Sequence, residues 1–445
     1  MIRRLTIAAI LLLLAPWTLL AQSQSSAPIS SPQPQEGQPQ NAGSQQQTSQ
    51  GYSLSPERAA QAIAYAHARH ILYFIEFAYG LVVLLLLLKF RIAPVFRDWA
   101  ESAARNRFLQ AMIFAPLLLL TLDLAGLPFG AEYHALALRF GESIQGWGSW
   151  FWDWTKGEIL SMAVAAFLIW LLYAVMRRSP HRWWLYVWAA MLPLLVFGVF
   201  IYPVIVEPLF FHFTPLAATH PELAAELEKV VTHAGRQIPE SRMYVMDAST
   251  KLNALNAYVT GLGASQRVVV WDTTIARMTT PEIALVFGHE MGHYVLGHVR
   301  EGIFFSALVL LVFLFVGSRL LARAVRRYAV PWGLRGVDDW ASLPVFLLLL
   351  SVFGFLFTPI DNAFSRHIEH QADQYGLEVV HGIIPDAPEV AAHAFQVLGE
   401  VDLEEPSPSW PVKMWFYDHP PIQERIAFAR SYDPWSKGES PRFVK

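Results

Sequence analysis

The chain of 445 residues contains no cysteine, which excludes disulfide bonds, thiolate nucleophiles and cysteine metal ligands. Charged residues are also scarce: they make up 16% of the sequence, whereas a soluble protein of ordinary composition has about a quarter. The net charge of -3 gives no excess of basic residues, so we expect no nucleic acid partner. Because cysteine is absent, any metal ion must be bound by His, Asp or Glu.

Long apolar segments take the place of the missing charge. The sequence is 54% hydrophobic, and six apolar runs each approach the roughly 20 residues that span a bilayer as a helix. The runs cover residues 71–92, 108–127, 159–176, 183–206, 303–321 and 343–360. Short connections join most of them, which predicts an antiparallel helical bundle in a lipid bilayer.

Several ionisable residues lie within or beside these runs. Because such groups are costly in lipid, we expect them to face the bundle interior or a wet cavity. For Glu76 and Asp123, a structural hydrogen bond between helices is an equally good interpretation. The residues are Glu76, Asp123, Glu207, Asp361 and Arg366.

The N-terminal part resembles an export sequence. Arg3 and Arg4 precede the apolar run 5–20, so residues 1–21 are predicted to form a signal peptide or N-terminal anchor. Residues 22–55 are rich in Gln, Ser and Pro, with almost no apolar side chains before position 51. We interpret this stretch as a disordered linker.

The largest polar region lies between the fourth and fifth apolar runs. Residues 221–235 have helical periodicity, residues 243–246 and 267–271 have the β-branched and aromatic content of strands, and residues 256–263 fit a strand followed by a turn. We therefore predict membrane helices over 56–206 and 303–360, with a small α+β metalloprotease region inserted at 207–302. Residues 361–430 complete the site, and 431–445 form a tail.

The sequence His289-Glu290-Met291-Gly292-His293 is the strongest functional signal. The helix that carries it starts either with a Thr279–Glu282 capping box or with Thr280 as the cap before Pro281. Residues four apart share a helix face, so His289 and His293 can hold one Zn²⁺ while Glu290 serves as a general base. The alternative is a buried, hydrogen-bonded pair of histidines.

A third ligand has to come from a distant segment. A metzincin would have another histidine at position 299, which is Val299, and His298 falls one residue short. Glu369 and Asp373 lie one helical turn apart, which suits a third ligand and a carboxylate that orients a ligand histidine. From the residues alone, a solvated amphipathic helix remains possible there. Glu369 also has competitors: Glu378, His367 and His370.

A family resemblance favours Glu369. Residues 289–298 together with 362–373 resemble the CaaX prenyl protease 1 family, which are integral-membrane gluzincin zinc metalloendopeptidases. Residues 207–216, 256–261 and 418–425 are also similar to that family, so the resemblance covers about 71–429. It implies a mainly α fold: a polytopic bundle of six to seven spans with an inserted small α+β gluzincin domain, enclosing a large water-filled chamber.

The resemblance also implies a role for each matching residue. Two histidines and one glutamate would bind a single Zn²⁺, and a second glutamate would be the general base. An aspartate and an arginine would support these ligands, a later histidine would stabilise the oxyanion, and two residues would hold the substrate backbone as an added strand. In that order the residues are His289, His293, Glu369, Glu290, Asp373, Arg425, His419, Asn256 and Ala257.

Two features depart from the family pattern. The family's first helix is replaced here by the run 5–20 and the linker. In addition, the basic loops 89–107, 177–182 and 323–327, taken as cytoplasmic, place the zinc region on the outer side of a cell (inner) membrane. Family members are usually drawn with this region in the cytosol.

The sequence thus predicts a multi-pass membrane zinc metalloendopeptidase. Its partners would be the lipid bilayer and a peptide or protein substrate, lipidated or membrane-embedded. One alternative is a membrane-protein quality-control protease without a preference for prenyl groups. Another is a non-catalytic sensor with a zinc-protease fold, and an intramembrane protease fits less well because the motif precedes the apolar run at 303.

Overall fold

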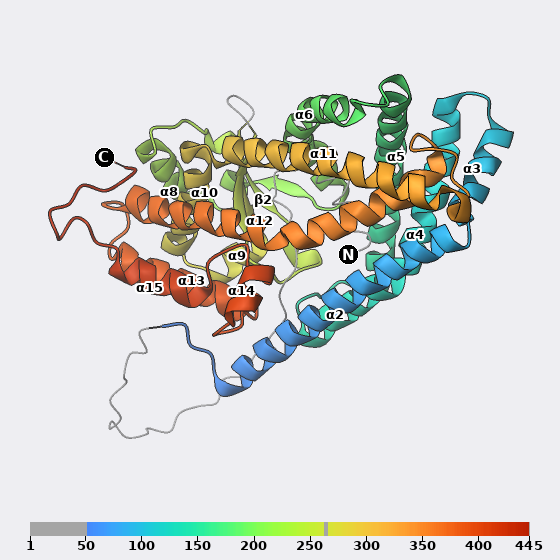
Figure 1. Ribbon diagram of the computed structural model, residues 1–445. Coiled ribbons are helices and arrows are strands. Elements are labelled where there is room, and N and C mark those ends of the chain that lie inside the picture. Colours follow the sequence, from blue (N-terminus) through green and yellow to red (C-terminus); the bar gives the residue numbers. More distant parts are fainter. Residues whose placement is uncertain (1–50, 262–265, 445) are drawn as a thin grey trace.

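The computed structural model describes residues 51–261 and 266–444, and long helices dominate it (Figure 1). Five helices are long and apolar enough to cross a membrane, and a sixth span results if one pair of helices bent by 49° is counted. The predicted residues 1–21 and most of the linker lie outside the described residues. The spans are α2 (Pro56–Lys89), α4 (Arg107–Phe140), α5 (Trp147–Arg178), α11 (His298–Trp332), α12 (Leu343–Val380), and the bent pair of α6 (Trp183–Ile201) with the turns that follow it.

Each of the six predicted apolar runs falls largely within one of these elements, which confirms the predicted membrane bundle. The fourth run differs from the others because its helix bends near Tyr202 instead of continuing straight. Pro203 lies at the bend and cannot donate a backbone hydrogen bond, which weakens a straight helix there.

Helix α12 joins the membrane part to the rest of the protein. Its 38 residues give a length of about 57 Å at 1.5 Å per residue, well beyond the roughly 30 Å of a hydrocarbon core. The apolar half begins at Leu343, and the polar half ends at Val380 without a break. In Figure 1 the second half of α12 runs among α8, α10, α13 and α15.

The inserted region contains a four-stranded sheet in the order β1-β2-β4-β3. Strands β2 (Met243–Met246) and β4 (Arg267–Trp271) pair in parallel, whereas β3 (Ala257–Thr260) runs antiparallel to β4. The predicted strands are all present. Strand β1 (Phe213–Pro215) was not predicted, because its three residues are too few to show an alternating pattern.

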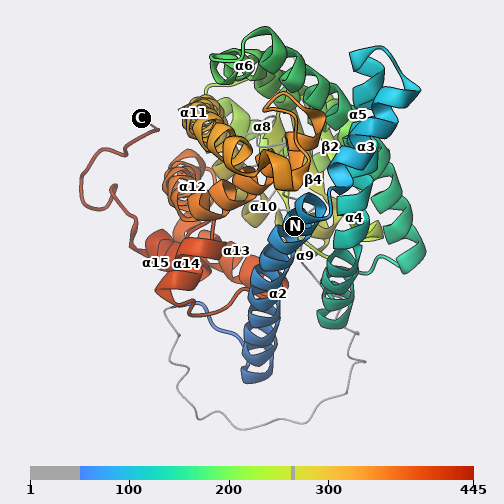
Figure 2. The ribbon, with the colours of Figure 1, turned by 45° about the vertical axis from the view of Figure 1, so that its right-hand side comes forward.

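Helices cover this sheet and build a second apolar core outside the membrane bundle. Buried side chains of α8, α10, the end of α12, α13 and α15 pack together in that core. Helices α13, α14 and α15 lie beneath α12 in both views (Figures 1 and 2). The bounds are α7 (Leu216–Thr219), α8 (Pro221–His233), α9 (Asp272–Arg277), α10 (Thr280–Leu296), α13 (Ala387–Val401), α14 (Trp410–Phe416) and α15 (Ile422–Ser431).

At the end of the membrane bundle that is remote from the sheet, charged residues connect α3 (Ile92–Ala103) to the loop between α11 and α12. Arg97 and Asp339 form a buried ion pair of 2.6 Å, and Arg335 binds Asp98 and Glu101 at 2.9 and 2.6 Å. The loops that are rich in basic residues therefore gather at the end that is remote from the inserted region.

The last residues of the predicted linker are packed, which corrects the expectation of disorder up to residue 55. The ring of Tyr52 is buried against Gly399 of α13, where an added Cβ would lie 2.7 Å from it. The side chain of Ser55 caps α2 by accepting a hydrogen bond from Arg58 N at 3.2 Å. The described linker residues thus attach the start of α2 to the C-terminal helices.

Candidate metal centre and active site

Helix α10 begins as one of the two predicted alternatives. Thr279 and Glu282 form the capping box, with Pro281 in the first turn. The helix ends at Gly297, whose φ of 82° suits glycine, and α11 starts at the next residue. His289 and His293 lie about two turns and one turn before this break and share one helix face.

Three glycines bring α10 and α12 into close contact. A Cβ on Gly376 would lie 3.0 Å from the backbone nitrogen of His289, and one on Gly292 would lie 3.2 Å from the Cα of Ala372. Gly288 faces Val379 at 2.9 Å in the same way. Because backbone atoms cannot yield as side chains do, only glycine permits this approach. It places the carboxylates of α12 against the imidazoles of α10.

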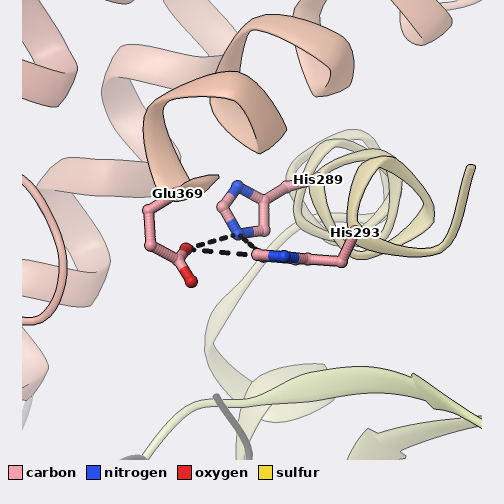
Figure 3. Close-up of side chains that lie close together, drawn as sticks. All are labelled: His289, His293 and Glu369. Atoms are coloured by element: carbon pink, nitrogen blue, oxygen red, sulfur yellow. Dashed lines mark hydrogen bonds and ion pairs between the residues drawn. The ribbon is translucent and has the colours of Figure 1, made fainter. Parts of the chain in front are cut away.

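The predicted metal ligands converge from these two helices (Figure 3). The Nε2 atoms of His289 and His293 are 3.1 Å apart, and they lie 3.1 and 3.5 Å from Oε2 of Glu369. One ligand atom from each residue lies within 4.8 Å of the others, in the one such cluster that the described residues form. The structure thus brings together the three residues that the sequence analysis proposed as ligands.

Asp373 orients His289. Its Oδ1 lies 2.8 Å from Nδ1 of the imidazole, so the ring can donate there and keep the Nε2 lone pair directed at the cluster. Arg425 of α15 binds the same carboxylate through two hydrogen bonds of 2.9 and 2.6 Å. Asp373 and Arg425 therefore lie beside the ligands, where the resemblance placed them.

His293 has an orienting chain that sequence reasoning missed. Its Nδ1 lies 3.1 Å from Nδ1 of His298, and Nε2 of His298 lies 3.2 Å from Oε1 of Gln371. If His298 donates to the amide oxygen, its Nδ1 accepts the proton of His293, which leaves the His293 Nε2 lone pair for a metal. No local sequence signal points to this chain, because His298 and Gln371 are 73 positions apart.

His419 reaches the same cluster from the segment between α14 and α15. Its Nε2 lies 3.2 Å from Oε2 of Glu369, and its Nδ1 lies 2.8 Å from Oδ1 of Asp418. Burial lowers the pKa of His419, but the two carboxylates outweigh burial and raise it well above its ordinary value. A protonated imidazole here can donate a hydrogen bond to a developing negative charge.

Glu290 lines a cavity of about 1040 Å³ that also includes His289, His419 and Asn256 in its wall. Burial raises the pKa of Glu290 above its ordinary value, against the opposing effect of the nearby imidazoles. The cavity extends along α2, α4 and α5, so the predicted general base faces a space enclosed by membrane helices.

The two predicted substrate-binding residues lie at the start of β3. Asn256 lines the cavity, and its carbonyl accepts a hydrogen bond from Trp271 N at 3.0 Å. Ala257 is fully buried. Strand β3 is an edge strand among the described residues, and its second edge has no strand partner there.

The competitors of Glu369 have other contacts. Glu378 accepts hydrogen bonds from the backbone nitrogens of Arg442, Phe443 and Val444 at 3.0, 2.6 and 2.8 Å. His367 lies 2.9 Å from Nε2 of Gln371, and the ring of His370 packs on Phe428. Glu378 therefore fastens the C-terminal tail and takes no part in the cluster.

The donor set suits zinc. Two imidazole nitrogens and one carboxylate oxygen are the protein ligands of many catalytic zinc sites, which leave a fourth position open. Asp373 and Glu369 overcome the effect of burial and raise the pKa of His289 to about 9, so the surroundings of this ring favour positive charge. A dication would meet that requirement and would separate the two facing Nε2 atoms.

A metal-ligand cluster of this kind, beside a glutamate in the wall of a cavity inside a membrane bundle, defines the protein as a membrane metalloprotease. Comparison with known families agrees. Residues 217–433 match the model of peptidase family M48, and residues 46–212 match one described as CAAX prenyl protease N-terminal, five membrane helices. The chain belongs to peptidase family M48, and it is a zinc metalloprotease of the multi-pass membrane type.

Individual relatives support this assignment. A Bacillus subtilis protein described as uncharacterized metalloprotease YhfN is 36% identical over 84% of this chain and 86% of its own. The CAAX prenyl protease 1 homologs of Oryza sativa and Homo sapiens are 26% and 24% identical and cover 85% and 76% of this chain. They match over 89% and 77% of their own lengths.

The fold also matches a solved structure. The crystal structure of S. mikatae Ste24p superposes with a TM-score of 0.72 at 22% identity, covering 84% of this chain and 88% of that one. At this identity the likeness concerns the fold.

Proposed function

We propose that this protein is an endopeptidase that binds one zinc ion through His289, His293 and Glu369 and hydrolyses peptide bonds inside the cavity. The observation that carries the proposal is the position of this cluster beside the cavity, whose wall includes its member His289 and the neighbouring Glu290. The zinc ion would polarise the scissile carbonyl group and make a water molecule nucleophilic near neutral pH.

The chain's own residues would move the protons and stabilise charge. Glu290 takes the proton from the attacking water and returns it to the leaving amine, and its raised pKa suits both steps. The protonated ring of His419 donates a hydrogen bond to the oxyanion. Asp373 and Arg425 keep the His289 ring in place, and Asn256 and Ala257 align the substrate backbone along the edge of β3 that has no strand partner among the described residues.

The substrate class we propose is a peptide segment of a lipidated or membrane-embedded protein. The cavity lies among α2, α4 and α5, so a chain that enters it comes from or passes the membrane. Two kinds of relative favour different substrates: the plant and animal relatives are named CAAX prenyl proteases, whereas the more similar Bacillus relative is named only as a metalloprotease. A quality-control protease without prenyl preference is thus the second candidate.

A cleavage assay separates these candidates. Detergent-purified protein would be given a farnesylated CaaX peptide, its unprenylated twin and an unfolded membrane protein, with Glu290→Ala and a chelator-treated sample as controls. Preference for the lipidated peptide supports a CaaX-type protease, and equal cleavage of all three supports quality control. Cleavage that survives in both controls would contradict the proposal.

We also propose that the protein lies in the cell (inner) membrane with its zinc region on the outer side. The end of the bundle with the basic loops is remote from the cluster, and such loops favour the cytoplasmic side.

A further inference from the structure

His419 owes its position to neighbouring elements, because its own segment has no regular structure. Residues 417–421 form the connection between α14 and α15. Pro420 and Pro421 restrict the backbone after His419, but they do not fix where the segment lies. What directs the imidazole toward Glu369 must therefore be the attachment of the two ends.

The first end is held by two side chains of α12. Helix α14 has only 7 residues, so its last carbonyl groups lack partners within the helix. Arg366 donates to the carbonyl oxygens of Lys413, at 3.0 Å, and of Tyr417, the residue before Asp418. Asn362 donates to the carbonyl of Met414 at 3.2 Å. These bonds attach the C-terminal end of α14 to α12.

The second end is held by the same helix. Arg425 lies in the first turn of α15, four residues after Pro421, and its guanidinium binds Asp373 of α12 through two hydrogen bonds. The segment with His419 is thus suspended between two attachments on α12. Its imidazole meets Glu369, which lies between them on that helix.

The four α12 residues share one face. Asn362, Arg366, Glu369 and Asp373 follow each other at intervals of four, three and four, the spacing of a single stripe along a helix. The stripe therefore carries the attachment of α14, a zinc ligand and the residue that orients His289. Because all are on one rigid helix, the position of His419 relative to Glu369 is set by the stripe.

We propose that Arg366, assisted by Asn362, is a positioning residue that holds His419 in place for the reaction, an inference that rests on the proposed peptide-bond hydrolysis. Nη1 of its guanidinium donates to both carbonyl groups, and the planar group fixes the directions of these N–H bonds, whereas the N–H bonds of a lysine ammonium rotate on a flexible chain. Arg366 lies outside the set of ligands and touches no reacting atom; it acts through the backbone that leads to His419.

The test is a double-mutant cycle on peptide cleavage. Arg366→Ala should lower kcat by about tenfold or more, but by no more than the roughly 10²–10³-fold loss that removal of an oxyanion donor causes. It should change KM by less than about threefold. In a His419→Ala background, Arg366→Ala should change kcat by less than about twofold, because the residue through which it acts is gone. Equal losses in both backgrounds would show a general structural role and would overturn the inference.

Two matched variants guard against a folding artefact. Lys413→Ala removes the ion pair between Lys413 of α14 and the exposed Glu424 of α15, and it should leave kcat within about twofold. Arg366→Lys keeps the charge, and should still lose most of the activity that Arg366→Ala loses. Full activity in Arg366→Lys would contradict the need for two fixed donors.

Hydrogen exchange provides a readout that does not depend on activity. Amides of residues 417–421 should exchange faster in Arg366→Ala than in wild type, but not in Lys413→Ala. Unchanged exchange in Arg366→Ala would overturn the inference. If instead the wild-type protein shows no cleavage that depends on Glu290, the proposed function fails, and this exchange measurement still decides whether Arg366 positions the segment.

Discussion

Asp373 joins two parts of the site, the ligand His289 of α10 and Arg425 of α15. Its carboxylate orients His289 and also neutralises the buried guanidinium of Arg425. Loss of the charge on Asp373 would therefore affect both the metal ligand and the attachment of α15. By comparison, Asp418 touches His419 but none of the three ligands in the hydrogen bonds described here.

Asp373→Asn should weaken zinc binding by about 10–100-fold, because the group that accepts from the His289 ring and from Arg425 loses its negative charge and one of its two acceptor oxygens. Competition with a chromophoric chelator measures this affinity. Asp418→Asn is the matched control and should keep the affinity while it lowers kcat. Equal zinc affinity in wild type and Asp373→Asn would show that this carboxylate does not support the ligand.

Between elements, the close approach of α10 and α12 determines whether the ligands meet. A Cβ at Gly376 would press on the His289 backbone at 3.0 and 3.2 Å, whereas one at Gly354, on the same helix, meets nothing within 4 Å. Gly376→Ala should destabilise the protein by about 1–3 kcal/mol and reduce its zinc content. Gly354→Ala should be neutral or slightly stabilising. Thermal unfolding and metal analysis compare the two, and equal behaviour would contradict the close contact.

The C-terminal tail is fastened to the end of α12 by Glu378. Three backbone nitrogens and the hydroxyl of Tyr432 donate to this buried carboxylate. Since a hydrogen bond to a charged group contributes about 1.5–3 kcal/mol, Glu378→Gln should lower the unfolding temperature and expose the tail to proteases. Cleavage activity per folded molecule should be retained. An unchanged rate of tail proteolysis would contradict the attachment.

Local sequence patterns predicted which residues share a helix face, but not which distant residues come into contact. The spacing of His289 and His293, and of Glu369 and Asp373, is a property of one helix and can be read from sequence. The contact of Gly376 with His289 joins residues 87 positions apart, and local periodicity contains no information on it. The same applies to His298 with Gln371 and to Arg366 with the end of α14.

For the whole molecule, the two ends of the bundle differ in charge and in content. The cluster of His289, His293 and Glu369 lies at one end, and α3 with Arg97 and the α11–α12 loop with Arg335 lie at the other. The bundle itself followed from the apolar runs, and the bend after α6 falls beside Pro203 in the fourth run, where a proline weakens a straight helix. The side of the membrane on which each end lies is a separate proposal and has a direct test.

Because the chain contains no cysteine of its own, only an introduced cysteine can react with a thiol reagent in that test. Ser436→Cys, at an exposed site near the C-terminus, should react with a membrane-impermeant maleimide in intact spheroplasts. Arg326→Cys, exposed near the end of α11, should react only after lysis. The reverse pattern would place the zinc region in the cytosol.

The most direct measurement of the central claim combines metal analysis and cleavage in one variant, Glu290→Gln. This substitution keeps the shape of the side chain but removes its ability to accept a proton. The account predicts one zinc ion per chain in the purified variant, together with a loss of peptide cleavage of at least about 10²–10⁴-fold. Wild-type cleavage by the zinc-loaded variant would contradict the assignment of Glu290 as the general base.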